Sequence, residues 1–237
     1  MTRALLAALV LELALFAAFP GIDHAVSGAF FRAGTFPLAH VPVLETVRDL
    51  IWDAAIALCL LCAALWAAVG LRARRAASDW RPFAFGTLTF ALGPILVVHS
   101  MKELWHRARP RDVLEFGGGL DFTLPGRIAG QCASNCSFPS GETAGAAAMG
   151  IVLLVLLARR RPVLAAVVGA VAIGGGLLRI AVGAHWLSDV VTAWLLTGLI
   201  ARLVWLALGM RDAAPPHRAL LRADLAALGR RIVPGKW

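Results

Sequence analysis

The sequence predicts an all-α fold, a polytopic membrane bundle of six transmembrane helices. Hydrophobic residues make up 59% of the 237 residues and charged residues only 16%, and the mean hydropathy is +0.77. These values, together with several long apolar runs, exclude a soluble domain of this size. No internal repeat or low-complexity linker interrupts the chain, so residues 1–237 are predicted to form a single membrane domain. The predicted spans cover about residues 4–20, 50–71, 83–101, 143–158, 163–182 and 187–208.

The first predicted span, residues 4–20, has two interpretations. Its short basic start at Arg3 and the small residues near its end are typical of a cleaved signal peptide. Glu12 within the apolar run and Pro20 at its end favour a span that is retained. A retained first span followed by five more places both termini on the same side of the membrane, which is predicted to be the cytoplasm.

The other five predicted spans are apolar runs, and the loops that join them differ in length and charge. A short basic loop joins the second span to the third, and a long polar loop joins the third to the fourth. The fourth and fifth spans are separated only by three arginines and Pro162. A turn this short predicts that the two helices are antiparallel neighbours. The sixth span opens near Trp186, shortly after the fifth one ends.

Basic residues predict the orientation of these spans. Most of them lie in the two short loops, in the C-terminal tail and at the N-terminus, which places that side in the cytoplasm. The basic residues on the outward side are not interleaved with aromatic residues on a soluble face, which argues against nucleic acid as a partner. The positive-inside rule does not account for basic residues on the outward side, so their presence there needs another explanation. These residues are Arg32, Arg48, Lys102, Arg107, Arg109, Arg111, Arg127 and Arg179.

The four cysteines form two pairs with different expectations. Cys59 and Cys62 fall within the second span and are expected to be small packing residues. Cys132 and Cys136 lie in the long outward loop, where an oxidising compartment permits a disulfide. A metal site is the alternative for this pair, but no histidine or second cysteine pair is near it in the sequence. A small structural disulfide is therefore predicted.

The third span ends in a basic segment, HSMKELWHRARPRD. Lys102 and Arg109 are seven residues apart, or two helical turns, so a continuous helix directs both to the same side. His106 lies between them on that side, and Pro110 is expected to end the helix. Taken alone, the segment is explained as well by a basic membrane edge whose long side chains reach towards the headgroups.

The fifth span ends in LLRIAVGAHWLSDVV, which contains Arg179, His185 and Asp189. If the sixth helix opens at Trp186, His185 and Asp189 lie one turn apart on one face. An aspartate in that position can accept the Nδ1 proton of the histidine and leave the Nε2 lone pair exposed. The alternative is a helix-capping aspartate beside an interfacial histidine, although a charged residue at the edge of a span is costly and usually functional.

A third polar segment, Phe138–Thr143 (FPSGET), precedes the fourth span. By itself, Ser140-Gly141 is a turn, and Glu142 in the first helical turn interacts favourably with the helix macrodipole. On the same outward side, however, the three segments together offer three cations, a turn of backbone N–H groups, a His–Asp pair and a carboxyl group. Phosphoryl transfer needs this combination: donors around the phosphate oxygens, an in-line nucleophile, and an acid for the leaving oxygen.

The same residues match a known family. The ordered set Lys102-x6-Arg109-Pro110, Pro139-Ser140-Gly141 and Arg179-x5-His185-x3-Asp189 resembles the three signatures of the type 2 phosphatidic acid phosphatase superfamily. Its membrane branch comprises the lipid phosphate phosphatases. The resemblance implies an α-helical bundle in the bacterial inner membrane, a site that faces the periplasm, a membrane lipid phosphate as substrate, and no metal or other cofactor.

The resemblance also assigns roles to individual residues. His185 takes the place of the nucleophile that becomes a phosphohistidine, and Asp189 takes that of the residue that orients it. The expected phosphate clamp consists of Lys102, Arg109, Ser140, Gly141 and Arg179.

Two positions depart from the family pattern. Leu178 stands where a serine usually precedes the arginine of the third signature, which removes one hydrogen bond. Glu142 stands where the second signature usually has the histidine taken to be the general acid. A carboxyl group can donate a proton only while it is protonated, and three nearby cations disfavour that state until a phosphate neutralises them. His106 or a water molecule is the alternative proton donor.

The second departure narrows the resemblance. The run from Cys132 to Glu142, in which a Cys-x3-Cys loop leads into Ser-Phe-x-Ser-Gly-Glu, resembles the bacterial lipid A 4′-phosphatase-like subgroup. The predicted function is thus metal-independent hydrolysis of a phosphate monoester or diphosphate on a membrane lipid. Lipid A, phosphatidate, phosphatidylglycerophosphate and polyprenyl diphosphate are the candidate substrates. A phosphotransferase using the same site, and an anion transporter or non-catalytic family member, are the alternatives.

Overall fold

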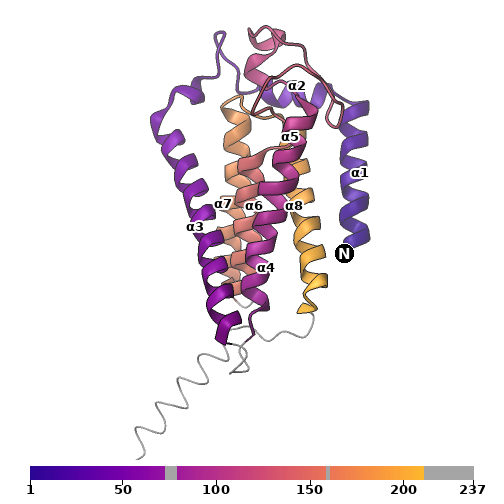
Figure 1. Ribbon diagram of the computed structural model, residues 1–237. Coiled ribbons are helices and arrows are strands. Elements are labelled where there is room, and N and C mark those ends of the chain that lie inside the picture. Colours follow the sequence, from indigo (N-terminus) through magenta and orange to yellow (C-terminus); the bar gives the residue numbers. More distant parts are fainter. Residues whose placement is uncertain (73–78, 159–160, 211–237) are drawn as a thin grey trace, which may run out of the picture.

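The computed structural model describes residues 1–72, 79–158 and 161–210, which form a helical bundle (Figure 1). Within these residues, the only β-pairing consists of two isolated bridges. The predicted all-α fold is confirmed. The main helices are α1 (Thr2–Ala18), α3 (Pro42–Arg72), α4 (Arg81–Phe90), α6 (Gly141–Leu153), α7 (Pro162–Ala181) and α8 (Leu187–Ala207).

Shorter elements gather at one end of the bundle. There α2 bends away from α1 by 83° and lies across the helix ends (Figure 1). The long loop between α5 and α6 covers the same end. The bounds of these elements are Gly21–Gly28 for α2, Pro37–His40 for η1, His99–Trp105 for α5, Pro110–Asp112 for η3 and Leu114–Phe116 for η4.

The third predicted span is one continuous helical segment with a local change of winding. α4 continues into the π-helical segment η2 (Ala91–Val98) and then into α5. Pro94 lies inside η2, where it has no N–H to donate to the preceding turn. The segment ends at His106, whose φ of 50° is left-handed. The prediction that Pro110 ends the helix is wrong, because the chain leaves the helical conformation four residues earlier.

Among the described residues, four helical segments are long and apolar enough to cross a membrane: Pro42–Gly70, Arg81–Asp112, Pro162–Ala181 and Leu187–Ala207. The bent pair of α1 and α2 adds a fifth if it counts as one span. The other predicted span corresponds to Gly141–Leu157, where α6 continues into η5 (Leu154–Ala158) and the apolar helix is shorter. All six predicted segments are helical, and the number that cross the bilayer stays a prediction.

The helix α6 forms the centre of the bundle, in contact with α3, α4, α7 and α8. Its residues from Thr143 to Gly150 are all buried, and most of them are alanine or glycine. Small side chains allow the neighbouring helices to approach closely. Close packing also requires a glycine at position 176 of α7. A Cβ atom on Gly176 would lie 2.8 Å from the side chains of Trp194 and Val190 on α8. This packing fixes the N-terminus of α6 at the end of the bundle that α2 covers.

An apolar core lies between α3, α4, α6 and α8, and Phe85, Met149 and Ile200 belong to it. Cys62 is 1% exposed within this core, which confirms that it is a packing residue, and Cys59 is partly buried beside it. The loops and the tail whose arginines predict the orientation lie largely at residues 73–78, 159–160 and 211–237, outside the described residues. The orientation and the cytoplasmic position of both termini therefore stay predictions.

Candidate active site

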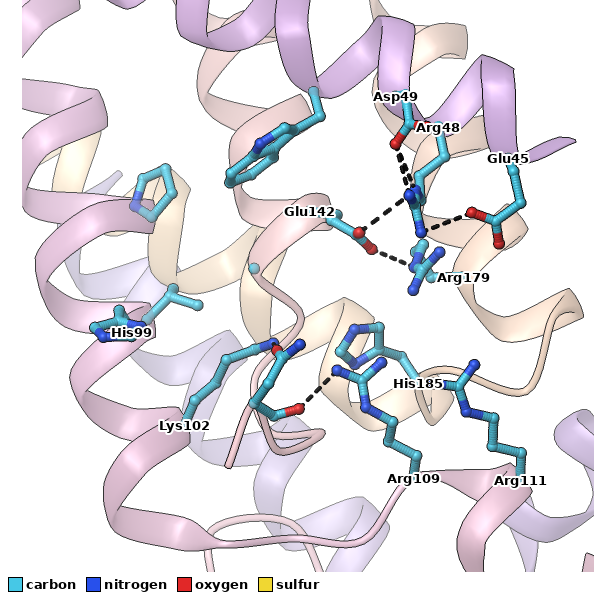
Figure 2. Close-up of a pocket in the computed structure, with 15 residues that line it drawn as sticks. Glu45, Arg48, Asp49, His99, Lys102, Arg109, Arg111, Glu142, Arg179 and His185 are labelled. Atoms are coloured by element: carbon cyan, nitrogen blue, oxygen red, sulfur yellow. Dashed lines mark hydrogen bonds and ion pairs between the residues drawn. The ribbon is translucent and has the colours of Figure 1, made fainter. Parts of the chain in front are cut away.

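The three polar segments converge at one end of the bundle, around a pocket of about 460 Å³ (Figure 2). Two of the predicted residues, Ser140 and Asp189, are fully buried and do not line the pocket. The others line it directly, and they are Lys102, Arg109, Gly141, Glu142, Arg179 and His185. Helices distant in the sequence therefore bring the predicted groups together.

His185 lies in the turn between α7 and α8 and is only 1% exposed. Its Nδ1 atom is 2.8 Å from the backbone carbonyl oxygen of Ser137. Because a carbonyl oxygen only accepts hydrogen bonds, Nδ1 carries the proton and Nε2 keeps its lone pair. Burial lowers the pKa of His185 to about 3, since an imidazolium would lose its hydration there. His185 is thus a neutral imidazole at the wall of the pocket, the state that a nucleophile requires.

Asp189 lies one turn after His185, but its Oδ2 atom is 3.6 Å from Nδ1, too far for a hydrogen bond. Its oxygens have other donors. Oδ2 accepts from the Ser137 hydroxyl group and, at 2.8 Å, from the backbone N–H of Trp186. Oδ1 accepts from Arg107 at 2.5 Å. Nδ1 of His185 therefore donates to the backbone carbonyl oxygen of Ser137 and not to Asp189, and Asp189 contacts Ser137 through the serine hydroxyl group.

Arg107 is a buried cation at the site to which the sequence analysis gave no role. Its side chain is 0% exposed and donates to Asp189, to Ser188 and, at 2.9 Å, to Asp23 of α2. Its Nε atom donates to the carbonyl oxygen of Thr123 at 2.8 Å. One arginine thus joins α2, the long loop and the first turn of α8, next to the segment that holds His185. The sequence did place Arg107 on the outward side without a role in the predicted phosphate clamp, and this could have pointed to it.

Two cations of the predicted clamp are held by Asn135, which the sequence analysis missed. Lys102 Nζ donates to the side-chain oxygen of Asn135 at 3.0 Å, and Arg109 Nη2 donates to its backbone oxygen at 2.7 Å. Asn135 has a left-handed φ of 48°. It lies in a loop that a disulfide closes between Cys132 and Cys136, whose Cα atoms are 5.6 Å apart. This loop gathers both cations, although α5 carries only Lys102.

His106 does not line the pocket. Its left-handed backbone follows the end of α5, and its Nδ1 atom lies 2.7 Å from the carbonyl oxygen of Cys132. The expectation that it lies on the same helical side as Lys102 and Arg109 is wrong, because the helix ends at Trp105. His106 is therefore not placed to act as the proton donor.

The FPSGET segment places the N-terminus of α6 in the pocket. Ser140 is the N-cap residue, and its hydroxyl oxygen accepts from the backbone N–H of Thr143 at 3.4 Å. In the described part of the chain, the N–H groups of Gly141 and Glu142 donate no hydrogen bond. Unpaired N–H groups at a helix N-terminus, together with the helix dipole, attract an anion.

Glu142 contacts two arginines on its side of the pocket (Figure 2). Its Oε2 atom pairs with Nε of Arg179, and its Oε1 atom lies 3.9 Å from Nε of Arg48. The Glu142 side chain is 31% exposed, whereas Arg179 is only 6% exposed. Arg48 belongs to α3 and was not predicted as a site residue. The carboxylate thus links the predicted clamp to a helix that carries none of the three sequence signatures.

Comparison with known proteins assigns the chain to a family. A model of the PAP2 superfamily matches residues 82–213, which contain every predicted site residue. A protein named lipid A 4′-phosphatase, from Rhizobium leguminosarum, is 35% identical over 77% of this chain and 85% of its own length. The chain belongs to the PAP2 superfamily. The family resemblance that the three signatures carry is thereby confirmed.

Two further proteins are similar to this chain. Another lipid A 4′-phosphatase, from Francisella tularensis subsp. novicida, is 43% identical over 42% of this chain and 46% of its own length. The crystal structure of a transmembrane PAP2-type phosphatidylglycerolphosphate phosphatase from Bacillus subtilis has a TM-score of 0.58 and 22% identity, covering 89% of this chain and 97% of that one. At this identity the likeness shows the fold alone, and that fold is a membrane helical bundle.

Proposed function

We propose that the protein hydrolyses a phosphate monoester of a membrane lipid at the periplasmic face of the bacterial inner membrane, without a metal ion and through a phosphohistidine. That it is a lipid phosphate phosphatase follows from its family and its relatives. The observation that carries the mechanism is His185, a buried neutral imidazole with a free Nε2 atom beside three cations. Within the described residues, no cluster of three His, Cys, Asp or Glu side chains suits a metal ion.

The reaction consists of two displacements at phosphorus. Lys102, Arg109 and Arg179, with the N-terminus of α6, bind the non-bridging oxygens. Nε2 of His185 attacks phosphorus as the bond to the lipid oxygen breaks, and that oxygen takes a proton from Glu142. Water then attacks the phosphohistidine and returns a proton to the carboxylate. The P–N bond breaks, which releases inorganic phosphate and the neutral imidazole.

Glu142 can serve as the acid because the substrate changes its surroundings. Without substrate, its carboxylate is the anion that faces Arg179. A bound phosphate dianion takes over as the partner of the clamp cations, so the Glu142 carboxyl group is free to turn towards the leaving oxygen. The protonated carboxyl group then donates to the leaving oxygen. Water is the alternative donor, since His106 lies outside the pocket.

For the substrate we propose a phosphate group of lipid A. Support comes from relatives in Rhizobium and Francisella that bear the name lipid A 4′-phosphatase. The run from Cys132 to Glu142, which resembles that subgroup, forms the disulfide loop and the α6 N-terminus of the pocket. Phosphatidate, phosphatidylglycerophosphate and polyprenyl diphosphate are the competitors that an assay must include.

Two other functions make different predictions. A phosphotransferase would pass the phosphoryl group from the same histidine to an alcohol, so an added lipid alcohol would become phosphorylated. An anion transporter would place its cations near the middle of the membrane within broken helices. Here Lys102, Arg109 and Arg179 line a pocket between the ends of α5 and α7, at one end of the bundle, which favours an enzyme working at a membrane surface.

The test is release of inorganic phosphate from a panel of lipid phosphates by the purified protein. We expect His185→Ala to reduce turnover to background, and acid-quenched wild-type protein to carry a labile phosphate that this variant lacks. His106→Ala is the matched control, because this histidine lies outside the pocket, and it should retain turnover. Undiminished activity in His185→Ala contradicts the phosphohistidine. Loss of activity in EDTA that magnesium or zinc restores contradicts the metal-independent mechanism.

A further inference from the structure

The pocket extends beyond the predicted site, towards the first turns of α3. Four residues of this helix line it: Glu45, Arg48, Asp49 and Trp52. Arg48 donates to Asp49 at 2.6 Å and pairs with Glu45 at 2.7 Å. Figure 2 shows the three charged residues across the pocket from His185. We call these four residues the α3 subsite.

The geometry of phosphoryl transfer decides which part of the substrate reaches the α3 subsite. In an in-line displacement the leaving oxygen points away from the attacking atom. With His185 as the nucleophile, the leaving group extends towards Glu142 and the α3 subsite behind it. The distance of 3.9 Å between Glu142 Oε1 and Arg48 Nε makes the two regions continuous. The α3 subsite therefore contacts the headgroup that carries the phosphate.

The side chains of the α3 subsite suit a sugar ring. Carboxylates accept hydrogen bonds from hydroxyl groups, and an arginine donates to their oxygens. The Trp52 ring offers an apolar face to the C–H groups of a pyranose. Glu45 and Asp49 would repel a second phosphate group at this position. A polyprenyl chain has no hydroxyl groups to donate to these carboxylates, and a glycerol headgroup has no ring to cover the indole.

Trp52 is held in place by the central helix. A Cβ atom on Gly145 would lie 3.1 Å from the Trp52 ring, so the ring packs directly on the backbone of α6, one turn after Glu142. Even so, Trp52 is 38% exposed and lines the pocket. On the same side Arg179 is 6% exposed, and in the described part of the chain its terminal nitrogens donate no hydrogen bond. Packing thus fixes the position of the Trp52 ring and of the Arg179 guanidinium group. Both still line the pocket, where a ligand can contact them.

We propose that Glu45, Arg48, Asp49 and Trp52 bind a sugar ring as the leaving group, so that this subsite selects glycolipid phosphates over glycerolipid phosphates. The proposal rests on the proposed lipid phosphatase function and goes beyond it, because it assigns the choice of headgroup to α3. It also explains why α3 contributes to the pocket although it carries none of the family signatures.

The test compares kcat/KM for lipid A phosphate with that for phosphatidate in the same micelles. The wild type should favour lipid A. Trp52→Ala and Asp49→Asn should each lower the ratio of the two values on the order of tenfold, through loss of ring contact and of a charged hydrogen-bond partner. Trp52→Phe, which keeps an aromatic ring, should retain most of the preference. The matched control is Asp53→Asn, since Asp53 is exposed on the same helix and does not line the pocket.

The outcomes distinguish a failure of the α3 subsite from a failure of the proposed function. A ratio that stays unchanged in both Trp52→Ala and Asp49→Asn overturns the α3 subsite, and so does a wild-type preference for phosphatidate. Asp49 is 57% exposed, so its variant does not depend on core packing for folding. Free glucosamine phosphate shows whether the sugar alone is recognised or only the lipid-bound sugar. If no lipid phosphate is hydrolysed, the proposed function fails, and the dissociation constants of the two lipids for the same variants decide the subsite.

Discussion

His185 and Glu142 line the same pocket in opposite environments. The histidine is buried and neutral, with its Nδ1 proton donated to a backbone carbonyl group. The glutamate is 31% exposed and faces two arginines. Two titratable groups whose environments differ in this way can take different roles in one reaction. We assign nucleophilic attack to the imidazole and proton transfer to the carboxyl group.

The role of Glu142 can be tested with two kinds of leaving group. Glu142→Gln removes the proton but keeps the shape of the side chain, so turnover of lipid esters should fall by roughly two to four orders of magnitude. A p-nitrophenyl ester leaves as a stable anion and should be much less affected. Glu103→Gln is the control, since Glu103 is exposed on α5 and does not line the pocket. Equal losses of turnover for both ester types would show that Glu142 only orients the substrate.

The lowered pKa of His185 predicts a pH-dependent contribution to stability. The unfolded histidine binds a proton near pH 6.5, whereas the folded pKa is about 3, so the unfolded state binds more protons between these values. The stability that wild type gains over His185→Ala should therefore decrease as the pH falls from 7 to 5. The difference between their melting temperatures at each pH measures this effect. A difference that grows on acidification would mean that the folded histidine is charged.

The positions of the helices could be predicted from the sequence, because they depend on the composition of consecutive residues. Apolar runs marked all six helical segments, because the length of a hydrophobic run is a property of consecutive residues. The predicted end of the third helical segment, at Pro110, lies later in the chain than the observed end at Trp105. A proline marks where a helix can no longer continue, but the left-handed backbone of His106 ends it earlier. Arg109 reaches the pocket from the loop instead, next to the Asn135 carbonyl group.

The parts of the site that sequence reasoning missed depend on contacts between distant segments. Asp23 and Arg107 are 84 residues apart, and no local pattern links a short helix near the N-terminus to the end of α5. Arg48 likewise meets Glu142 only because α3 packs against α6. The three signatures were predictable because each sits within a short stretch whose residue types already suggest phosphate chemistry. Partners across the bundle become visible only in the folded chain.

Removing Arg107 should destabilise the fold as well as the site. Arg107→Ala leaves Asp23 and Asp189 buried without their cation, at a cost of about 3–5 kcal/mol. The melting temperature should fall on the order of 10 °C, and phosphate release should fall with it, because Asp189 no longer holds Ser137. Arg127→Ala is the control, since Arg127 is exposed in the same long loop. Equal melting temperatures for the two variants would contradict a structural role for the buried network.

For the whole molecule, the decisive property is that the pocket lies at one end of the bundle. The end of α8 and the start of α4 lie at the opposite end (Figure 1). A membrane that contains these helices therefore exposes the pocket on one side only. The excess of arginines in the two short loops and the C-terminal tail of the sequence predicts that the pocket faces the periplasm. Lipid headgroups of the outer leaflet would then be the ones in reach.

Labelling of intact cells tests this orientation. A cysteine introduced by Arg127→Cys lies on the pocket side, and one introduced by Asp79→Cys lies at the opposite end beside α4. In a background without Cys59 and Cys62, a membrane-impermeant maleimide that passes the outer membrane should label the first variant in intact cells. It should label the second only after the inner membrane is opened. The reverse pattern would put the pocket in the cytoplasm, where the arginine-rich loops are expected, and the proposed periplasmic reaction would have to be abandoned.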